Sequence, residues 1–187
     1  IVGAGRTDAG VHALGQVASY SPPTFRDPVL LQHALARLLP REVRPLAVRP
    51  MSSRFHACRS AAGKIYRYRI VNRPMVLPFD APYVWQVPQA LDIEAMNAAA
   101  MRLAGLRDFS SFSAVGGQTK TFVRDLRRLA IVTRDDGEIS IEAEADGFLY
   151  RMVRVIAGVL VEIGRRRRSP ESIDALLNLP RVGSAAA

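Results

Sequence analysis

The segment GAGRTDAGVHALGQV, residues 3–17, is the most distinctive stretch of this 187-residue chain. Its glycines permit sharp backbone turns and the close approach of a ligand. Arg6 and Asp8 lie two residues apart, and such residues project to the same side of an extended segment. The pair predicts either a reactive site or a surface ion pair of little energetic weight. The spacing is not that of a nucleotide-binding glycine loop.

Composition indicates a globular protein with a strongly basic surface. Hydrophobic residues make up 49% of the chain, which is enough to build a core. The formal net charge is +9, and all basic residues except Lys64 and Lys120 are arginines. Such a surplus favours a polyanionic partner, and guanidinium groups bind phosphates through two parallel hydrogen bonds. Nucleic acid is therefore the expected class of partner.

The same composition excludes several other classes of protein. Cys58 is the only cysteine, so no internal disulfide can form and a reducing cytoplasm is the expected location. His12, His33 and His56 lie far apart and show no metal-ligand spacing, so we expect no metal. No apolar run approaches the roughly 20 residues that cross a bilayer, so we expect no membrane contact.

Hydrophobic periodicity predicts a mixed arrangement of helices and strands. We expect helices over residues 28–39, 92–104, 148–163 and 170–178. We expect strands over residues 16–20, 64–72, 83–87, 122–133 and 138–145. Residues 43–50 look extended, with prolines typical of a sheet edge, and Asp135-Asp136-Gly137 predicts a hairpin. The fold class is therefore α+β.

Two lobes are expected. Residues 51–63 are polar, small and irregular, as in a connecting segment. We place the boundary at residue 51. The remainder of an N-terminal lobe, with the Asp8 loop, then covers residues 1–51, and a C-terminal lobe covers residues 52–187.

Three further features carry alternative interpretations. Tyr66 projects from the same face of strand 64–72 as Tyr68, which suits core packing or an aromatic platform for a base. Arg154 interrupts an apolar helix, where it is either buried beside a partner or reaches out from the helix edge. The run Arg165–Arg168 is either a phosphate contact or a solvated helix end that suits the helix dipole.

Taken together, these motifs resemble those of the tRNA pseudouridine synthase A family. The string GRTDAGVHALGQV is similar to the family's signature. Four later segments follow in the family's order: FHACRSAAGKIYRYRI from Phe55, DFSSF, VRDLRRL and GFLYRMVRVIAG. The resemblance covers essentially the whole chain. Cys58 departs from it, because the family usually has arginine there, and Arg107 stands where histidine or asparagine is common.

The resemblance implies a fold and an activity. The fold is that of pseudouridine synthases, with two α+β lobes whose mixed or antiparallel sheets surround a central RNA-binding cleft. The activity is that of an isomerase, an intramolecular transferase that converts uridine to pseudouridine at positions 38, 39 and 40 of the tRNA anticodon stem-loop. It implies a homodimer with one tRNA bridging both subunits, and it requires no cofactor.

The resemblance also assigns roles to four residues. Asp8 is the catalytic carboxylate; whether it attacks ribose C1′, attacks the base or removes a ribose proton is left open. Arg6 helps to extrude the target uridine, and Tyr66 packs against the flipped base. Arg154 is a buried arginine that pairs with Asp8 and keeps it ionised.

Comparison with the family also concerns the two ends of the chain. Family members carry a strand and helix before the aspartate loop and a strand after the last helix, and neither is found in residues 1–187. Because missing strands expose unpaired sheet edges, we expect these residues alone to be weakly stable and poorly active. Conversion of uridine by the isolated 187-residue chain would contradict that expectation.

Three other functions remain open at this stage. A non-catalytic RNA-binding module could retain the basic surface without the chemistry. A pseudouridine synthase of another family could act on ribosomal RNA, although the GRTDAGVHA string argues against it. A basic ribosomal protein would have no reason to combine Asp8, Tyr66 and Arg154.

Overall fold

The computed structural model describes residues 1–24, 26–178 and 184–186. By its contacts the chain divides into an N-terminal unit, Ile1–Ala61, and a C-terminal unit, Ala62–Ala187. The lobe boundary predicted at residue 51 falls earlier, in the irregular segment that ends the N-terminal unit, and that assignment of lobes stays a prediction.

The N-terminal unit contains little regular structure. Strands β1 (Val2–Gly3) and β2 (Ala18–Ser19) pair in antiparallel fashion and close the ends of the glycine-rich segment. Helix α1 (Pro28–Leu38) confirms the first predicted helix. Its cap is Asp27, whose Oδ1 accepts hydrogen bonds from the backbone N–H groups of the helix's second and third residues, both at 2.9 Å. Residues 43–50 form no strand, in keeping with two prolines that lack a donor for a ladder.

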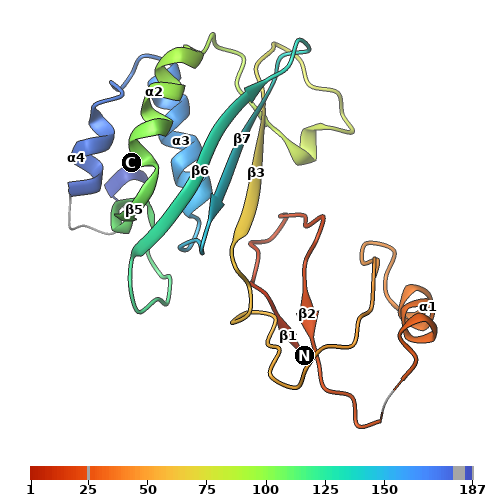
Figure 1. The fold of residues 1–187 in the computed structure, drawn as a ribbon. Coiled ribbons are helices and arrows are strands. Elements are labelled where there is room, and N and C mark those ends of the chain that lie inside the picture. Colours follow the sequence, from red (N-terminus) through yellow and green to blue (C-terminus); the bar gives the residue numbers. More distant parts are fainter. Residues whose placement is uncertain (25, 179–183, 187) are drawn as a thin grey trace. The chain divides into compact units, whose positions relative to one another are not determined.

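The C-terminal unit is built on a five-stranded sheet in the order β4-β3-β7-β6-β5 (Figure 1). Its strands are β3 (Lys64–Val71), β4 (Trp85–Gln86), β5 (Gly105–Asp108), β6 (Val123–Thr133) and β7 (Glu138–Ala145). All neighbouring strands are antiparallel except β3 and β4, which are parallel. The predicted hairpin is confirmed, with Gly137 at φ 81° between β6 and β7. The α+β prediction is therefore confirmed.

Three helices lie on one side of this sheet (Figure 1). They are α2 (Ile93–Leu103), α3 (Met152–Gly164) and α4 (Ser172–Asn178). Short 3₁₀ turns are η1 (Ala81–Tyr83), η2 (Ser110–Phe112) and η3 (Ser184–Ala186). Helix α3 begins later than predicted because Arg151 adopts the left-handed conformation, φ 56°, which a right-handed helix cannot continue. Among the described residues, no helix combines the length and apolar character needed to span a membrane.

The core fills the space between the sheet and the helices. Its fully buried members come from every layer, for example Ile70, Leu126 and Ile141 of the sheet and Met96, Leu103, Ile156 and Leu160 of the helices. Side chains alternate along β3, because Ile70 enters this core while Arg67 and Arg69 project from the opposite face.

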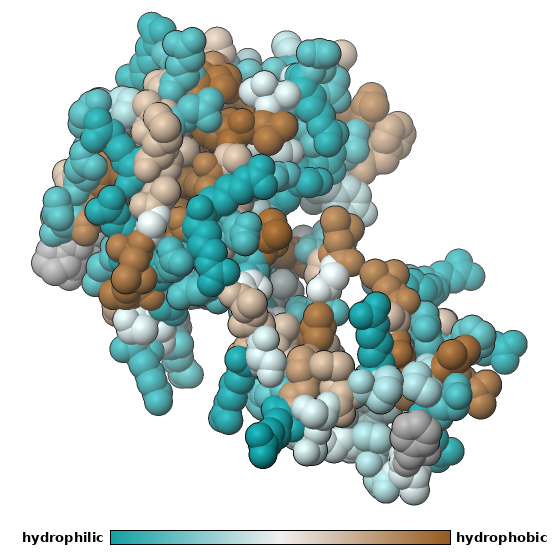
Figure 2. Space-filling model, viewed as in Figure 1, coloured by the Kyte–Doolittle hydropathy of each residue, from teal (hydrophilic) through white to brown (hydrophobic). Residues whose placement is uncertain are grey.

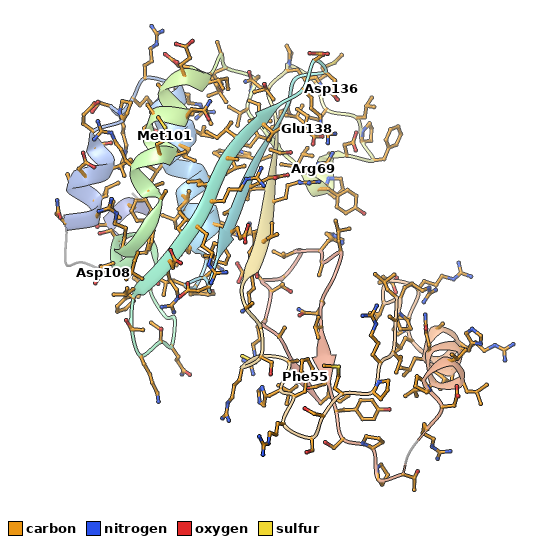
Figure 3. The ribbon with its side chains drawn as sticks, viewed as in Figure 1. Phe55, Arg69, Met101, Asp108, Asp136 and Glu138 are labelled. Atoms are coloured by element: carbon orange, nitrogen blue, oxygen red, sulfur yellow. The ribbon has the colours of Figure 1, made fainter. Side chains whose placement is uncertain are left out.

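That opposite face carries cross-strand ion pairs, and Figure 2 shows largely hydrophilic side chains over it. The Arg69 guanidinium donates two hydrogen bonds, of 3.2 and 2.6 Å, to the Glu138 carboxylate. Figure 3 labels both residues on neighbouring strands of the sheet. Glu142 accepts from Arg67 at 2.8 Å and lies 3.7 Å from Arg128. Glu138 is only 8% exposed, and the Arg69 guanidinium lowers its pKa below the ordinary value.

We expect Glu138→Gln to lower the free energy of unfolding by about 1 kcal/mol at pH 7, because it removes a charge-assisted pair that is partly shielded. A carboxyl with a lowered folded-state pKa contributes stability above its unfolded value, about 4.3, and loses it as pH falls through the folded value. Denaturant unfolding at pH 7 and at pH 3 measures both effects. The difference from wild type should shrink at pH 3, and a difference of equal size at both pH values would contradict this assignment. Glu42→Gln, at an exposed site of the N-terminal unit, is the matched charge control.

The run Arg165–Arg168 forms the corner that follows α3. Arg166 has φ 58°, its N–H donates to Ile163 O, and the next N–H donates to Glu162 O. This is the double hydrogen bond of a Schellman helix end, with arginine at the position that usually holds glycine. The guanidinium of Arg166 lies 3.2 Å from the carboxylate of Asp92, the N-cap residue of α2. The run thus joins the end of α3 to the start of α2.

Candidate active site

The Asp8 loop is closed by hydrogen bonds to its backbone carbonyl groups. Ala4 N–H donates to Val17 O at 2.8 Å, and the Gln16 side chain donates to Gly5 O at 2.9 Å. At the tip, Val11 N–H donates to Asp8 O at 3.1 Å. The third residue of this turn is Gly10, whose φ of 77° is the value that a type II turn requires there. The glycine is needed for the turn that begins at the predicted catalytic carboxylate.

The two charged side chains of this loop differ in exposure. Asp8 is partly buried, whereas Arg6 is exposed. A carboxylate on a tight, glycine-containing turn can be approached closely by a ligand. An exposed arginine two residues earlier is able to change its rotamer at little cost in packing. Both properties suit the roles that the resemblance assigns.

Tyr66 lies near the start of β3 and is partly buried. Its ring meets Phe148 edge to face, with centroids 5.0 Å apart and an interplanar angle of 83°. Its cross-strand partner is the small residue Ala143. Tyr68, by contrast, packs edge to face on Trp85 at 6.2 Å and against the core. Of the two roles that suit this face of the strand, Tyr68 therefore takes core packing.

Arg154 lies in the first turn of α3 and is exposed. The prediction that it is buried is therefore wrong. The buried side of α3 repeats at Met152, Ile156, Val159 and Ile163, and the 3.6-residue period turns Arg154 away from that stripe. The apolar sequence of the helix concealed this narrow polar edge, on which Arg154 lies.

Two of the predicted residues, Tyr66 and Arg154, belong to the C-terminal unit. Tyr66 contacts Phe148, and Phe148 shortly precedes the helix turn that carries Arg154. Asp8 and Arg6 belong to the N-terminal unit. Sequence reasoning missed Phe148 as the support of Tyr66. The only available signal was an aromatic residue within the segment GFLYRMV, and nothing in its spacing indicated the contact.

Within the ranges that the structure describes, no three His, Cys, Asp or Glu residues are grouped as metal ligands. The chemistry that these residues offer is that of a carboxylate, an aromatic ring and two guanidinium groups.

Comparisons with known proteins agree with the motifs. A family model described as tRNA pseudouridine synthase matches residues 99–186. The chain is 39% identical over 177 residues to tRNA pseudouridine synthase A 2 of Clostridium tetani, covering 95% of this chain and 71% of that protein. It is 44% identical over 180 residues to tRNA pseudouridine synthase A of Moorella thermoacetica, covering 94% and 71%. A relative in Methylacidiphilum infernorum is 40% identical over 190 residues, covering 100% and 74%. The chain therefore belongs to the tRNA pseudouridine synthase A family.

Proposed function

We propose that this protein isomerises uridine to pseudouridine in the anticodon stem-loop of tRNA, at positions 38, 39 and 40. Membership of the family carries the proposal, since relatives named tRNA pseudouridine synthase A are 38–44% identical to this chain over 94–95% of its length. The strongly basic composition agrees with an RNA substrate. Comparison of tRNA pseudouridine in cells with and without the gene tests the proposal.

The reaction rearranges atoms without net oxidation or reduction. The bond between N1 of uracil and C1′ of ribose breaks, the base turns, and a bond forms between C5 and the same C1′. The proton on C5 leaves, and N1 gains one. A carboxylate suits this chemistry because it can form a covalent adduct or stabilise an electron-poor ribose.

We assign Asp8 as this carboxylate and three other residues as its helpers. Arg6 aids extrusion of the target nucleotide, which must leave the helix before C1′ can be reached. The ring of Tyr66, supported by Phe148, offers a flat surface against which a flipped uracil can turn. Arg154 is assigned as the ionic partner of Asp8, since a nearby cation favours the ionised carboxylate.

We infer that the assembly is a cytoplasmic homodimer in which one tRNA spans both subunits. In each subunit, residues 1–51 and 52–187 would form the two lobes of a central RNA-binding cleft. The isomerisation balances without an external oxidant, reductant or cofactor. Sedimentation of the protein with and without tRNA tests the dimer, and a single protomer bound to tRNA would contradict it.

A further inference from the structure

Two arginines face each other across strands β5 and β6. Arg107 and Arg124 are direct partners in the antiparallel register. Like charges directly opposite one another destabilise a sheet, so the pair has a cost in the free protein. Arg107 is exposed and Arg124 is partly buried.

Neutral groups surround Arg124. Its guanidinium donates to Thr121 O at 2.9 Å, to Val123 O at 2.6 Å and to Thr119 Oγ1 at 3.2 Å. Among the residues that the structure describes, no carboxylate forms an ion pair with Arg107 or Arg124. Within these described residues their two positive charges are therefore not neutralised.

The nearby carboxylates point elsewhere. Alternation along the strands places Asp108 and Asp125 on the face opposite to the arginines. Figure 3 labels Asp108 at the end of β5, where its side chain accepts from Ser110 N–H at 2.8 Å. Asp125 faces Arg127 at 3.4 Å. The arginine pair thus presents net positive charge on its own face.

A short chain of contacts joins this pair to Tyr66. A Cβ added at Gly147 would lie 3.6 Å from the Nε of Arg124, so the arginine packs over that glycine. The next residue, Phe148, contacts the ring of Tyr66. Lys120, exposed between the two threonines that bind Arg124, adds a third cation.

We propose that Arg107, Lys120 and Arg124 bind a backbone phosphate of the RNA substrate beside the nucleotide held at Tyr66. Guanidinium groups bind phosphate oxygens in bidentate fashion, and an anion between two facing arginines would relieve their repulsion. The position next to Tyr66 rests on the proposed function. The binding of RNA phosphate by these side chains does not.

The salt dependence of tRNA binding tests the site. In the protein as the cell makes it, Arg107→Gln should reduce the slope of log affinity against log salt by about 0.7–0.9, the loss of one phosphate contact. The double variant with Arg124→Gln should lose about twice as much. Arg128→Gln is the matched control, since it removes an arginine that lies 3.7 Å from Glu142 on the opposite face, and its slope should equal that of wild type.

An unchanged slope for Arg107→Gln would overturn the proposal. This variant is decisive because Arg107 makes no side-chain hydrogen bond within the described residues, whereas Arg124 also holds its loop. Pseudouridine formation by the same wild-type preparation separates the two claims. An active enzyme with an unchanged slope refutes the phosphate site alone, and an inactive protein whose slope falls refutes only the proposed function.

Discussion

Replacement of Asp8 by asparagine should reduce pseudouridine formation by about 10³-fold or more while leaving tRNA binding nearly intact. Asparagine has almost the same size and can keep the backbone turn that begins at this residue. Its amide cannot act as a carboxylate nucleophile or base. The codon should be changed in the protein's own gene, and pseudouridine in tRNA quantified.

Asp27→Asn is the matched control for this substitution. Asp27 belongs to the same unit and caps α1, and asparagine caps a helix as well as aspartate does. The control should form pseudouridine at the wild-type rate. Activity that survives in Asp8→Asn would refute the chemistry assigned to this carboxylate.

Replacement of Tyr66 by leucine should slow isomerisation by about 10- to 100-fold, because stacking of a base on an aromatic ring contributes roughly 1–3 kcal/mol. Tyr66→Phe retains the ring and its edge-to-face contact with Phe148, so it should stay close to wild type. Single-turnover rates with a tRNA substrate measure both variants.

Tyr68→Leu is the control for Tyr66, since it removes the neighbouring tyrosine on the same face of β3. Its ring packs on Trp85 and the core, so we expect a lower melting temperature with the wild-type rate while folded. A phenylalanine variant of Tyr66 as slow as the leucine variant would show that the phenol, and not the ring face, is what the reaction needs.

The fold was predictable from the sequence wherever a single residue determines the local backbone conformation by its own chemistry. Asp27 and Pro28 defined the start of α1, since an acceptor side chain and a fixed φ suit only that end of a helix. The glycine between β6 and β7 marked a turn that needs positive φ. Alternation along β3 separated the core side chains from the arginines that form ion pairs.

Features that depend on distant residues could not be predicted in this way. No strand was predicted over residues 105–108, yet β5 begins at Gly105, because this strand depends on pairing with β6. Arginine at φ 58° in position 166 carries no local signal, since glycine is the usual residue there. The exposure of Arg154 follows from which side of α3 meets the sheet, and the chain around it is apolar throughout.

In the candidate site, too, local features were predictable and contacts between distant residues were not. The Asp8 turn was predictable because glycine and aspartate act through their own backbone and neighbours. Two other contacts join residues that are distant in the sequence, and no local signal indicates them. Phe148 supports Tyr66, and the strand register sets Arg107 opposite Arg124. Resemblance to a family assigns roles to single residues. The contacts between those residues and their neighbours are shown only by the folded chain.

The most direct test of the function is a map of pseudouridine in total RNA from cells that carry the gene and from cells that lack it. We predict that pseudouridine disappears at positions 38, 39 and 40 of tRNA anticodon arms and stays unchanged in ribosomal RNA. Loss from ribosomal RNA, or an unaltered anticodon arm, would contradict the assignment.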